Sequence, residues 1–436
     1  MQYYKSFNTE AMELSRLLPE EESELYKRHF IPIPLEDFAK RFSLNEKDRN
    51  EQTAIAAVAD AIHQNFNLSF DLVFGSADHR INGQDEFIKV IDSEKLTEEN
   101  IRGKAYTNKD GKLVSFIHAY SKKVVYVQIP EGKSVDINVL FVNNDAPLCT
   151  QVLIKVGKGA KLNLFEWHAS KTKAKSMSGV LHEIVLDQYA KAEVDMLHNE
   201  DENTYVVGFS KGKIGDNGEL RINYIYNGGI NTRSKNEIDS SGHAARSTIN
   251  EIVIGSAGQK FDLNTVIANV DADTVSDLES RAALMDKSVC ILKGFADVGE
   301  NAKRSLSFVN ERGILLDKTA YMSSIPGMSI KNSDVKATHS SATAPIDTDS
   351  LFYLMSRGSD ETSAKKLLVS GFFSGNIAKI DSPVVKSIVA SLIHEKINNR
   401  TFGTVPKLNT VGVWFDTSAD ASDIFQGHYK YRNVKQ

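Results

Sequence analysis

A lone histidine, His339, lies in a stretch whose residue types suit chemistry. The stretch reads VKATHSSATAP over residues 335–345, and the apolar run LFYLMSRG follows over residues 351–358. A neutral imidazole is a good ligand for iron. The other interpretation is a histidine satisfied by backbone hydrogen bonds at the corner between a strand and a helix. The residue alone does not decide between a metal ligand and such a structural histidine.

The segment FEWH offers a second set of metal-ligand types. Glu166 and His168 are two residues apart, so a strand places the carboxylate and the imidazole on one face. This spacing allows a metal site. Solvent-facing polar residues are common on strands, however, and we expect that more ordinary arrangement here.

The two cysteines, Cys149 and Cys290, raise the question of a cluster site or a sulfur relay. They form no C-x-x-C pair and have no nearby histidine at ligand spacing. Both lie in strand-like runs, APLCTQVL and SVCILKG. We expect both to be buried as small hydrophobic residues. The chain then lacks the thiolates to hold a cluster by itself.

Composition narrows the class of protein. The chain has 436 residues, 41% hydrophobic residues and a net charge of −5, which does not favour binding to nucleic acid or to an anionic membrane. The glycines, such as Gly228-Gly229 and Gly255, are not followed by the G-K-[ST] of a nucleotide-binding P-loop. Any use of ATP must therefore come from a partner. The apolar stretches are too short to span a membrane, and the first residues lack the apolar core of a signal peptide. With only two cysteines, we expect a cytoplasmic protein.

The hydrophobic period changes along the chain. Up to about residue 90 the pattern predicts helices at 10–18, 20–30 and 53–66, with IPIPLEDF extended between the last two. From about residue 112 to about residue 315 the period is two, which predicts many short strands without helices.

A similar turn introduces many of these strands. The turns recur from EGKSVDINV at Glu131 to AGQKFDLNT at Ala257, roughly 16 to 31 residues apart. Repeats of a strand and a turn favour a β-helix. A large β-sandwich or barrel is the alternative fold.

Helices return near the C-terminus. The sequence predicts helices at 350–357, 361–373 and 384–396, with Asp349, Asp360 and Ser382 as N-caps and Gly358 as a stop. We therefore divide the chain into a helical region (1–100), a β-helix core (101–345), a second helical region (346–397) and a tail (398–436). The tail is polar and aromatic, and we expect it to be partly disordered or a binding arm.

The opening stretch resembles the signature of the SufB/SufD family of iron–sulfur cluster assembly proteins. The matching pieces are Asp334-Val335-Lys336, His339, Ala342-Thr343, Ile346-Asp347, Leu351-Phe352-Tyr353-Leu354 and Ser356-Arg357-Gly358. Upstream, SRAALMDKSVCILKGFADVGENA from Ser280 resembles the strands that precede this signature. The helical start, long β middle and helical end are also similar to the family's layout.

Within this family the chain looks most like a D-type member. B-type members typically carry a glutamate directly after the histidine and D-type members often a glycine, whereas this chain has Ser340. Many D-type members have a cysteine two residues before the histidine, where this chain has Ala337. Asp273 stands where the resemblance leads one to expect another histidine.

The resemblance implies a right-handed parallel β-helix flanked by helical regions, acting as a non-catalytic scaffold. A B-type and a D-type chain pair at the ends of their β-helices, and each carries the ABC-type ATPase SufC on its C-terminal helices. Sulfur comes from a cysteine desulfurase, usually through the B-type chain. Iron or an iron–sulfur cluster is then held transiently at the interface, with no firmly bound cofactor. A homodimer is expected when the partner is missing.

The resemblance also implies roles for residues. His339 becomes a candidate iron or cluster ligand, and Val335, Ala337 and His339 become candidates for the subunit interface. The candidate ATPase contacts are Leu351, Phe352, Tyr353, Arg357 and Lys366. Helix spacing favours core packing for most of the LFYL run, so the polar face from Arg357 to Lys366 is the preferred contact.

Two other functions remain open. One is a β-helix enzyme that acts on polysaccharides, although such enzymes are generally exported and use clustered carboxylates in a groove. The other is a purely structural family member without a metal role, which Ala337 and Ser340 keep possible.

Overall fold

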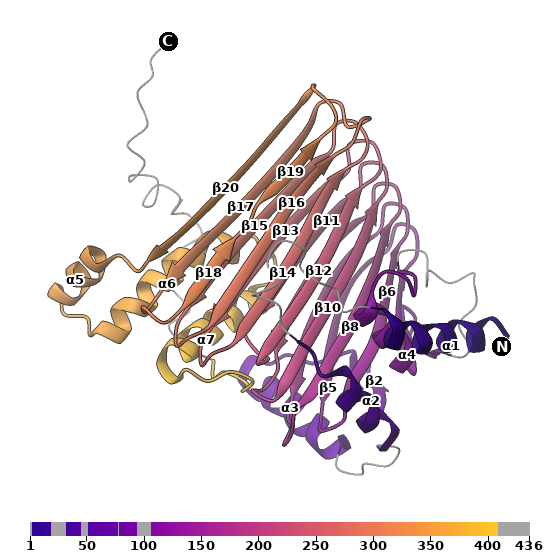
Figure 1. Ribbon diagram of the computed structural model, residues 1–436, viewed down its shortest axis with the longest axis horizontal. Coiled ribbons are helices and arrows are strands. Elements are labelled where there is room, and N and C mark those ends of the chain that lie inside the picture. Colours follow the sequence, from indigo (N-terminus) through magenta and orange to yellow (C-terminus); the bar gives the residue numbers. More distant parts are fainter. Residues whose placement is uncertain (1, 19–31, 45–50, 77, 94–105, 409–436) are drawn as a thin grey trace.

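Two long sheets wind around a common interior. The computed structural model describes residues 2–18, 32–44, 51–76, 78–93 and 106–408. The first sheet has the order β2-β1-β5-β7-β9-β11-β13-β15-β17-β20, and the second runs β18-β16-β14-β12-β10-β8-β6-β4-β3, with β19 beside β16. Figure 1 shows the strands stacked side by side, with helices at both ends of the chain.

The first sheet consists of β1 (Leu72–Gly75), β2 (His79–Ile81), β5 (Ser134–Asn143), β7 (Lys161–Ser170), β9 (Lys191–Asn199), β11 (Glu219–Tyr226), β13 (Arg246–Gly255), β15 (Val275–Leu284), β17 (Ser305–Leu315) and β20 (Val335–Pro345). The second consists of β3 (Ile88–Asp92), β4 (Lys123–Ile129), β6 (Leu148–Val156), β8 (Ser176–Leu186), β10 (Thr204–Ile214), β12 (Asn231–Ser240), β14 (Lys260–Asn269), β16 (Val289–Val298), β18 (Tyr321–Ser324) and β19 (Gly327–Ile330). The helices are α1 (Gln2–Leu17), α2 (Leu35–Leu44), α3 (Glu51–Phe66), α4 (Lys112–Tyr120), α5 (Thr348–Ser356), α6 (Glu361–Ala378) and α7 (Pro383–Asn399).

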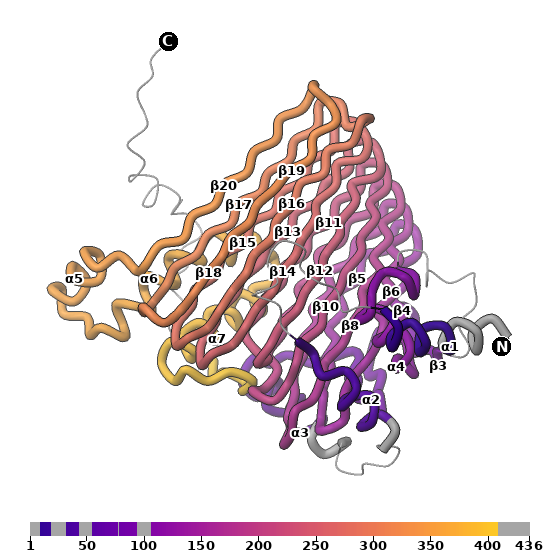
Figure 2. The backbone as a smooth tube through the Cα atoms, viewed as in Figure 1, coloured from indigo at the N-terminus to yellow at the C-terminus, as the bar shows by residue number. Residues whose placement is uncertain are grey.

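From β4 to β17 the chain alternates between the two sheets, and successive strands of each sheet pair in parallel (Figure 2). In the first sheet, pairs such as Ser134–Lys161 and Val275–Leu306 give a coil of 27 to 31 residues. The prediction of a parallel β-helix is therefore confirmed, and the sandwich or barrel alternative is wrong.

The recurring turn lies at one corner of each coil. Gly159, Tyr189 and Asn217 occupy stacked positions there, each with positive φ between 53° and 63°. The N–H of Tyr189 donates to the carbonyl of Asp216, and the N–H of Asn217 to that of His243, at 2.8 Å each. Each turn therefore bonds to the same turn of the next coil, which explains the repeat in the sequence.

The coils are stabilised by three apolar layers: one in the interior and one on the outer face of each sheet. Alternate strand residues fill the interior, among them Val139, Val152 and Ile249. The opposite residues of the first sheet pack under α3, α6 and α7, and those of the second sheet pack under α2 and α4. Both faces of most strands are therefore covered, as is usual for parallel sheets.

Several predicted elements differ from the structure. The alternating pattern predicts strands from residue 112, but residues 112–120 form α4, since a short apolar run fits either state. Strands β1 to β3 occupy 72–92, a region predicted as helical. The predicted helix at 20–30 and most of the predicted tail, 409–436, lie outside the described residues.

The C-terminal helices begin close to their predicted starts. Asp360 and Ser382 are the N-caps of α6 and α7, as predicted. The cap of α5 is Asp347 instead of Asp349, because its carboxylate accepts from the N–H groups of Asp349 and Ser350. Gly358, with φ of 98°, follows the end of α5 and allows the chain to turn.

Candidate functional site

Strand β20 ends the first sheet and has no strand on its outer side within the described residues. The N–H of Ile346 donates to the carbonyl of Leu315 on β17 at 2.8 Å. Backbone groups alternate in direction along a parallel strand, so the odd-numbered residues of β20 direct theirs away from β17. Pro345, which has no N–H to donate, occupies one of these odd positions. The strand therefore presents an open edge for further pairing.

His339 lies in the middle of this edge strand, in register with Val309. The placement of His339 at a corner between strand and helix was wrong, because the small polar run around it pairs with β17 along its whole length. The buried side chain of Val309 belongs to the interior layer. Side chains in register on neighbouring parallel strands share a face, so His339 lies on the same face as the interior layer. It is nevertheless exposed, because β20 is the last strand of the sheet.

The three predicted interface residues alternate along β20. Val335 and Ala337 are half-buried and His339 is exposed, and all three lie on the same face of the strand. Ser340 points to the other face, where its hydroxyl donates to Asn310 at 2.9 Å. The structure therefore brings the three predicted residues together at the end of the β-helix.

A carboxylate that the sequence pattern did not single out lies one coil below. Glu311 on β17 is fully buried, in register with Ser341. Ser324 donates to one carboxylate oxygen, and the other, Oε1, has no hydrogen-bond partner among the described residues. Burial, together with the nearby charge of Glu251, raises the pKa of Glu311 to about 7. Only the coil register reveals this group, since the sequence shows it as an ordinary strand residue.

Helix α5 extends beyond the end of the stacked strands (Figure 1) and buries none of its residues. Phe352 and Tyr353 are 73% and 56% exposed, and Arg357 lies over the ring of Tyr353 at 5.2 Å. Leu351 is only half-buried. The expectation of core packing for the LFYL run was therefore wrong, because α5 projects beyond the stacked strands.

The neighbouring helix α6 continues this exposed surface and is fixed to the β-helix. Lys366 is half-buried, and Leu367 beside it is 49% exposed. Further along, the side chain of Asn376 donates to Asn250 on β13 at 2.6 Å. Lys379 lies 2.7 Å from Glu279 on β15. One end of the helical region therefore projects and the other is bonded to the outer face of the first sheet.

Asp273, where the resemblance suggested a histidine, lies in a turn. It is one of the stacked corner residues with positive φ, at 60°. Its carboxylate accepts from Arg304 at 2.7 Å and lies 3.0 Å from His243. Its place in the fold is therefore that of a corner residue held by two basic side chains.

Both cysteines are buried, as expected. Cys149 packs under α4 and Cys290 lies in the interior layer. Burial raises the pKa of both thiols well above the usual range. Neither is therefore an accessible thiolate.

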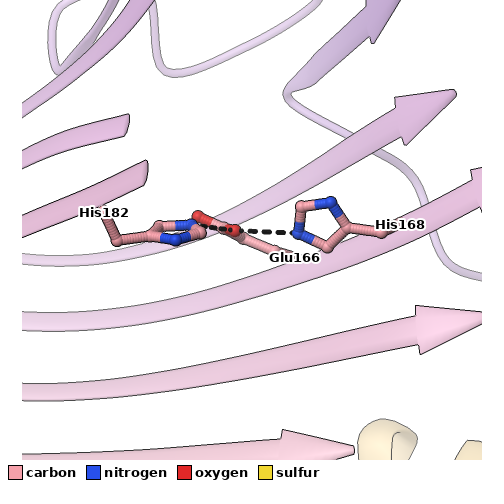
Figure 3. Close-up of side chains that lie close together, drawn as sticks. All are labelled: Glu166, His168 and His182. Carbon is pink, nitrogen blue, oxygen red and sulfur yellow. Dashed lines mark hydrogen bonds and ion pairs between the residues drawn. The ribbon is translucent and has the colours of Figure 1, made fainter. Parts of the chain in front are cut away.

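The FEWH pair lies inside the β-helix, so the expectation of solvent-facing side chains was wrong. Glu166 and His168 are fully buried, and His182 from the opposite sheet joins them (Figure 3). Burial raises the pKa of Glu166, but His182 and His168 outweigh burial and bring it to about 2. Burial lowers the pKa of His168 and favours the neutral ring.

These features define a class: a parallel β-helix with an open terminal strand and a projecting helical arm. Residues 140–372, from β5 into α6, match the family described as "SUF system FeS cluster assembly, SufBD core domain". The match covers more than half of the chain, and the chain belongs to this family. The family expected from the opening stretch is thereby confirmed.

Relatives from distant organisms agree with this assignment. The chain is 27% identical over 222 residues to an iron–sulfur cluster assembly SufBD family protein of Mycobacterium tuberculosis, covering 49% of this chain and 56% of the relative. It is 23% identical over 310 residues to the iron–sulfur cluster assembly protein SufD of Bacillus subtilis, covering 67% and 70%. The chain therefore spans little more than half the length of the mycobacterial relative. Across the described residues, no helix is long and apolar enough to cross a membrane.

Proposed function

We propose that this chain is a non-catalytic scaffold subunit of a SUF-type iron–sulfur cluster assembly complex, in the role of the D-type member. It pairs with a B-type chain, carries an ABC-type ATPase and works in the cytoplasm. One observation carries this proposal: within the family match, the β-helix ends in a parallel strand, β20, whose outer edge pairs with no strand of the described segments.

The open edge of β20 supports pairing with a related chain. An unpaired strand edge is a template for adding a strand from another chain. The odd-numbered positions offer outward backbone groups, while Val335, Ala337 and His339 supply a shared side-chain face. A B-type β-helix with a similar open end satisfies both features, and a second copy of this chain does so when the B-type chain is missing.

The projecting helix supports docking of the ATPase. Helices α5 and α6 expose the apolar residues Phe352, Tyr353, Met355 and Leu367, and we call this part of the two helices the α5–α6 surface. Arg357 borders it with a positive charge. Apolar residues gathered in this way mark protein-binding surfaces. Because α6 is bonded to β13 and β15, a movement of a docked ATPase is passed to the first sheet, of which β20 is the last strand.

The cargo is iron, sulfide or a nascent cluster, held transiently between the paired chains. His339 offers an imidazole on the interior side of the open end. The buried thiols of Cys149 and Cys290 do not supply ligands there, so the thiolates come from the B-type chain. A cysteine desulfurase delivers sulfur to that chain.

A matched pair of variants tests the proposal. The tagged chain is co-expressed with its B-type and ATPase partners and recovered anaerobically, and mass spectrometry identifies what is retained. Ser341 is an outward-facing position, so Ser341→Pro removes one free N–H without breaking a bond to β17, whereas Ser341→Ala keeps that N–H. We expect the proline variant to lose the B-type chain and keep the ATPase, and the alanine variant to keep both. Absence of both partners from the unmodified chain would refute the scaffold role.

A further inference from the structure

A cluster of histidine and glutamate side chains lies inside the β-helix, away from β20 and the α5–α6 surface. On β7, Nε2 of His168 lies 3.2 Å from Oε2 of Glu166. From β8 in the opposite sheet, Nε2 of His182 lies 2.8 Å from the same oxygen. Figure 3 shows both rings directed at the carboxylate from either side. Two sheets therefore bring three donor atoms to one point in the interior.

The spacing of these atoms suits a metal ion. Two ligand atoms that bind zinc at its usual bond lengths in a tetrahedral site lie about 3.3 Å apart. The contacts at 3.2 Å and 2.8 Å are close to this separation, so a small outward shift of the side chains makes room for an ion. Two imidazoles and a carboxylate are a donor set that binds zinc and ferrous iron.

A second pair extends the cluster into the next coil. His198 on β9 stacks on His168 with ring centroids 4.6 Å apart, and its Nδ1 lies 3.2 Å from Oε1 of Glu200. His168, His198 and Glu200 also have donor atoms within 4.8 Å of one another. Opposite His198, Gly208 has no side chain to fill the space, and a Cβ there would lie 3.6 Å from Nε2 of His198.

Hydrogen bonds alone do not complete this cluster. Among the described residues, four of its buried polar atoms have no hydrogen-bond partner: Oε1 of Glu166, Nδ1 of His168, Nδ1 of His182 and Oε2 of Glu200. Buried polar atoms are usually paired, so the unpaired carboxylate oxygens of Glu166 and Glu200 call for an explanation such as an ion. The unpaired Oε1 of Glu166 is a further oxygen donor for an ion that Oε2 binds.

The buried carboxylates of the cluster also favour a metal ion. The cluster holds two carboxylates, Glu166 and Glu200, that are both fully buried. Within the part of the chain that the structure describes, Glu166 and Glu200 pair with histidines and with no lysine or arginine. Buried carboxylates are normally paired with a cation or bind a metal, so a divalent cation suits this site.

Aromatic rings on both sides hold the imidazoles in place. Phe141 stacks on His168 at 4.7 Å, and Tyr226 stacks on His198 at 5.4 Å. All four residues occupy the same register position in successive coils. The stack therefore fixes the ring planes before an ion arrives, as the surroundings of metal sites generally do.

We propose that Glu166, His168 and His182 bind one divalent transition-metal ion of the zinc or ferrous type inside the β-helix, with His198 and Glu200 as a supporting pair. The site links β7 to β8 across the interior, so the ion acts as a cross-link between the two sheets. This inference goes beyond the scaffold function and does not depend on it. Because the site is closed, the ion enters as the chain folds.

The test uses cobalt as the probe. The full-length chain is produced in medium supplemented with Co²⁺, purified, and examined by elemental analysis and visible absorption, since Co²⁺ held by nitrogen and oxygen ligands absorbs in the visible range. We expect one cobalt per chain, a visible band, and a higher melting temperature than that of chain produced without added metal. Glu166→Gln and His182→Gln preserve side-chain size and are expected to lose the ion while keeping the circular dichroism of the β-helix.

Controls separate this site from surface binding. His243→Gln and His339→Gln change exposed histidines and are expected to retain the cobalt, as is His198→Gln in the supporting pair. Wild-type chain without cobalt would overturn the proposal. If folded His182→Gln retained cobalt, the assignment of His182 as a ligand would be wrong. If an interior variant fails to fold, cobalt content and absorption of the wild-type chain still decide whether the ion is bound.

Discussion

Asn250 on β13 and Asn376 on α6 bond to each other in both directions across the boundary between sheet and helix. The side chain of Asn376 donates to Oδ1 of Asn250 at 2.6 Å, and the side chain of Asn250 donates to the backbone carbonyl of Asn376 at 3.0 Å. Both residues are fully buried. This pair is therefore a fixed joint between the β-helix and the helical region.

Replacing Asn376 by alanine is expected to loosen this joint. The change leaves Asn250 buried without its donor, which costs about 1–3 kcal/mol of unfolding free energy. Urea unfolding followed by circular dichroism measures the loss. Ser374→Ala is the matched control on the same helix, because the hydroxyl of Ser374 donates to the carbonyl of Gly371 within α6. Equal stability of the two variants would contradict the role of the joint.

Phe352→Ser is expected to weaken ATPase docking without altering the fold. Phe352 is 73% exposed and contributes no core packing, so its loss removes contact area only from the α5–α6 surface. We expect at least about a tenfold loss of affinity, the usual scale for a central aromatic contact. Titration calorimetry of the purified chain with the ATPase measures it. The control is Val384→Ser, which changes an exposed apolar residue at the start of α7. Similar losses for both variants would argue against a specific surface.

Glu311→Gln is expected to change the pH dependence of stability. The pKa of this carboxyl is about 7 in the folded chain and near 4.5 when unperturbed, so the folded chain binds more protons between these values. Its contribution to the unfolding free energy therefore falls as pH rises through this range. Above pH 7 the glutamine variant is expected to be the more stable, by up to about 3 kcal/mol, whereas at pH 4 the two are expected to be similar.

Denaturant unfolding of both chains from pH 4 to pH 8 measures this difference. Glu300→Gln at an exposed position is the control and is expected to show a difference that does not vary with pH. A difference for Glu311→Gln that is equally flat would show that the pKa of Glu311 is not raised in the folded chain.

His339→Ala is expected to separate a metal role from a structural one. The side chain is exposed, so the variant keeps its fold and its partners. We expect lower activity of iron–sulfur enzymes in cells that depend on this variant. The control is Lys336→Ala, an exposed residue on the opposite face of β20. Normal maturation with His339→Ala would favour a purely structural family member.

The β-helix was predictable because its corners repeat. The turns at Tyr189 and Asn217 bond to equivalent turns in the next coil, and this need recurs in the sequence once per coil. The α4 run, KLVSFIHAY, was not predictable in this way. It is apolar throughout, and such a run fits a buried strand as well as a helix.

The candidate sites were less predictable, for a physical reason. Alternation places Glu166 and His168 on one face, but both faces of that strand are buried, so the pattern does not show which face meets water. His182 reaches them only through the register of two sheets. Likewise, Phe352 is exposed because α5 projects beyond the stacked strands, which helix spacing alone does not reveal.

The central claim is that β20 accepts a strand from a related β-helix, and amide hydrogen exchange tests it most directly. Exchange in residues 335–345 is measured by mass spectrometry for the chain alone and for its complex with the B-type chain. The outward N–H groups at Ala337, His339 and Ser341 face no partner strand among the described residues and become bonded if a strand is added. We therefore predict strong protection of this segment in the complex. A complex that forms while exchange across β20 stays unchanged would contradict the claim.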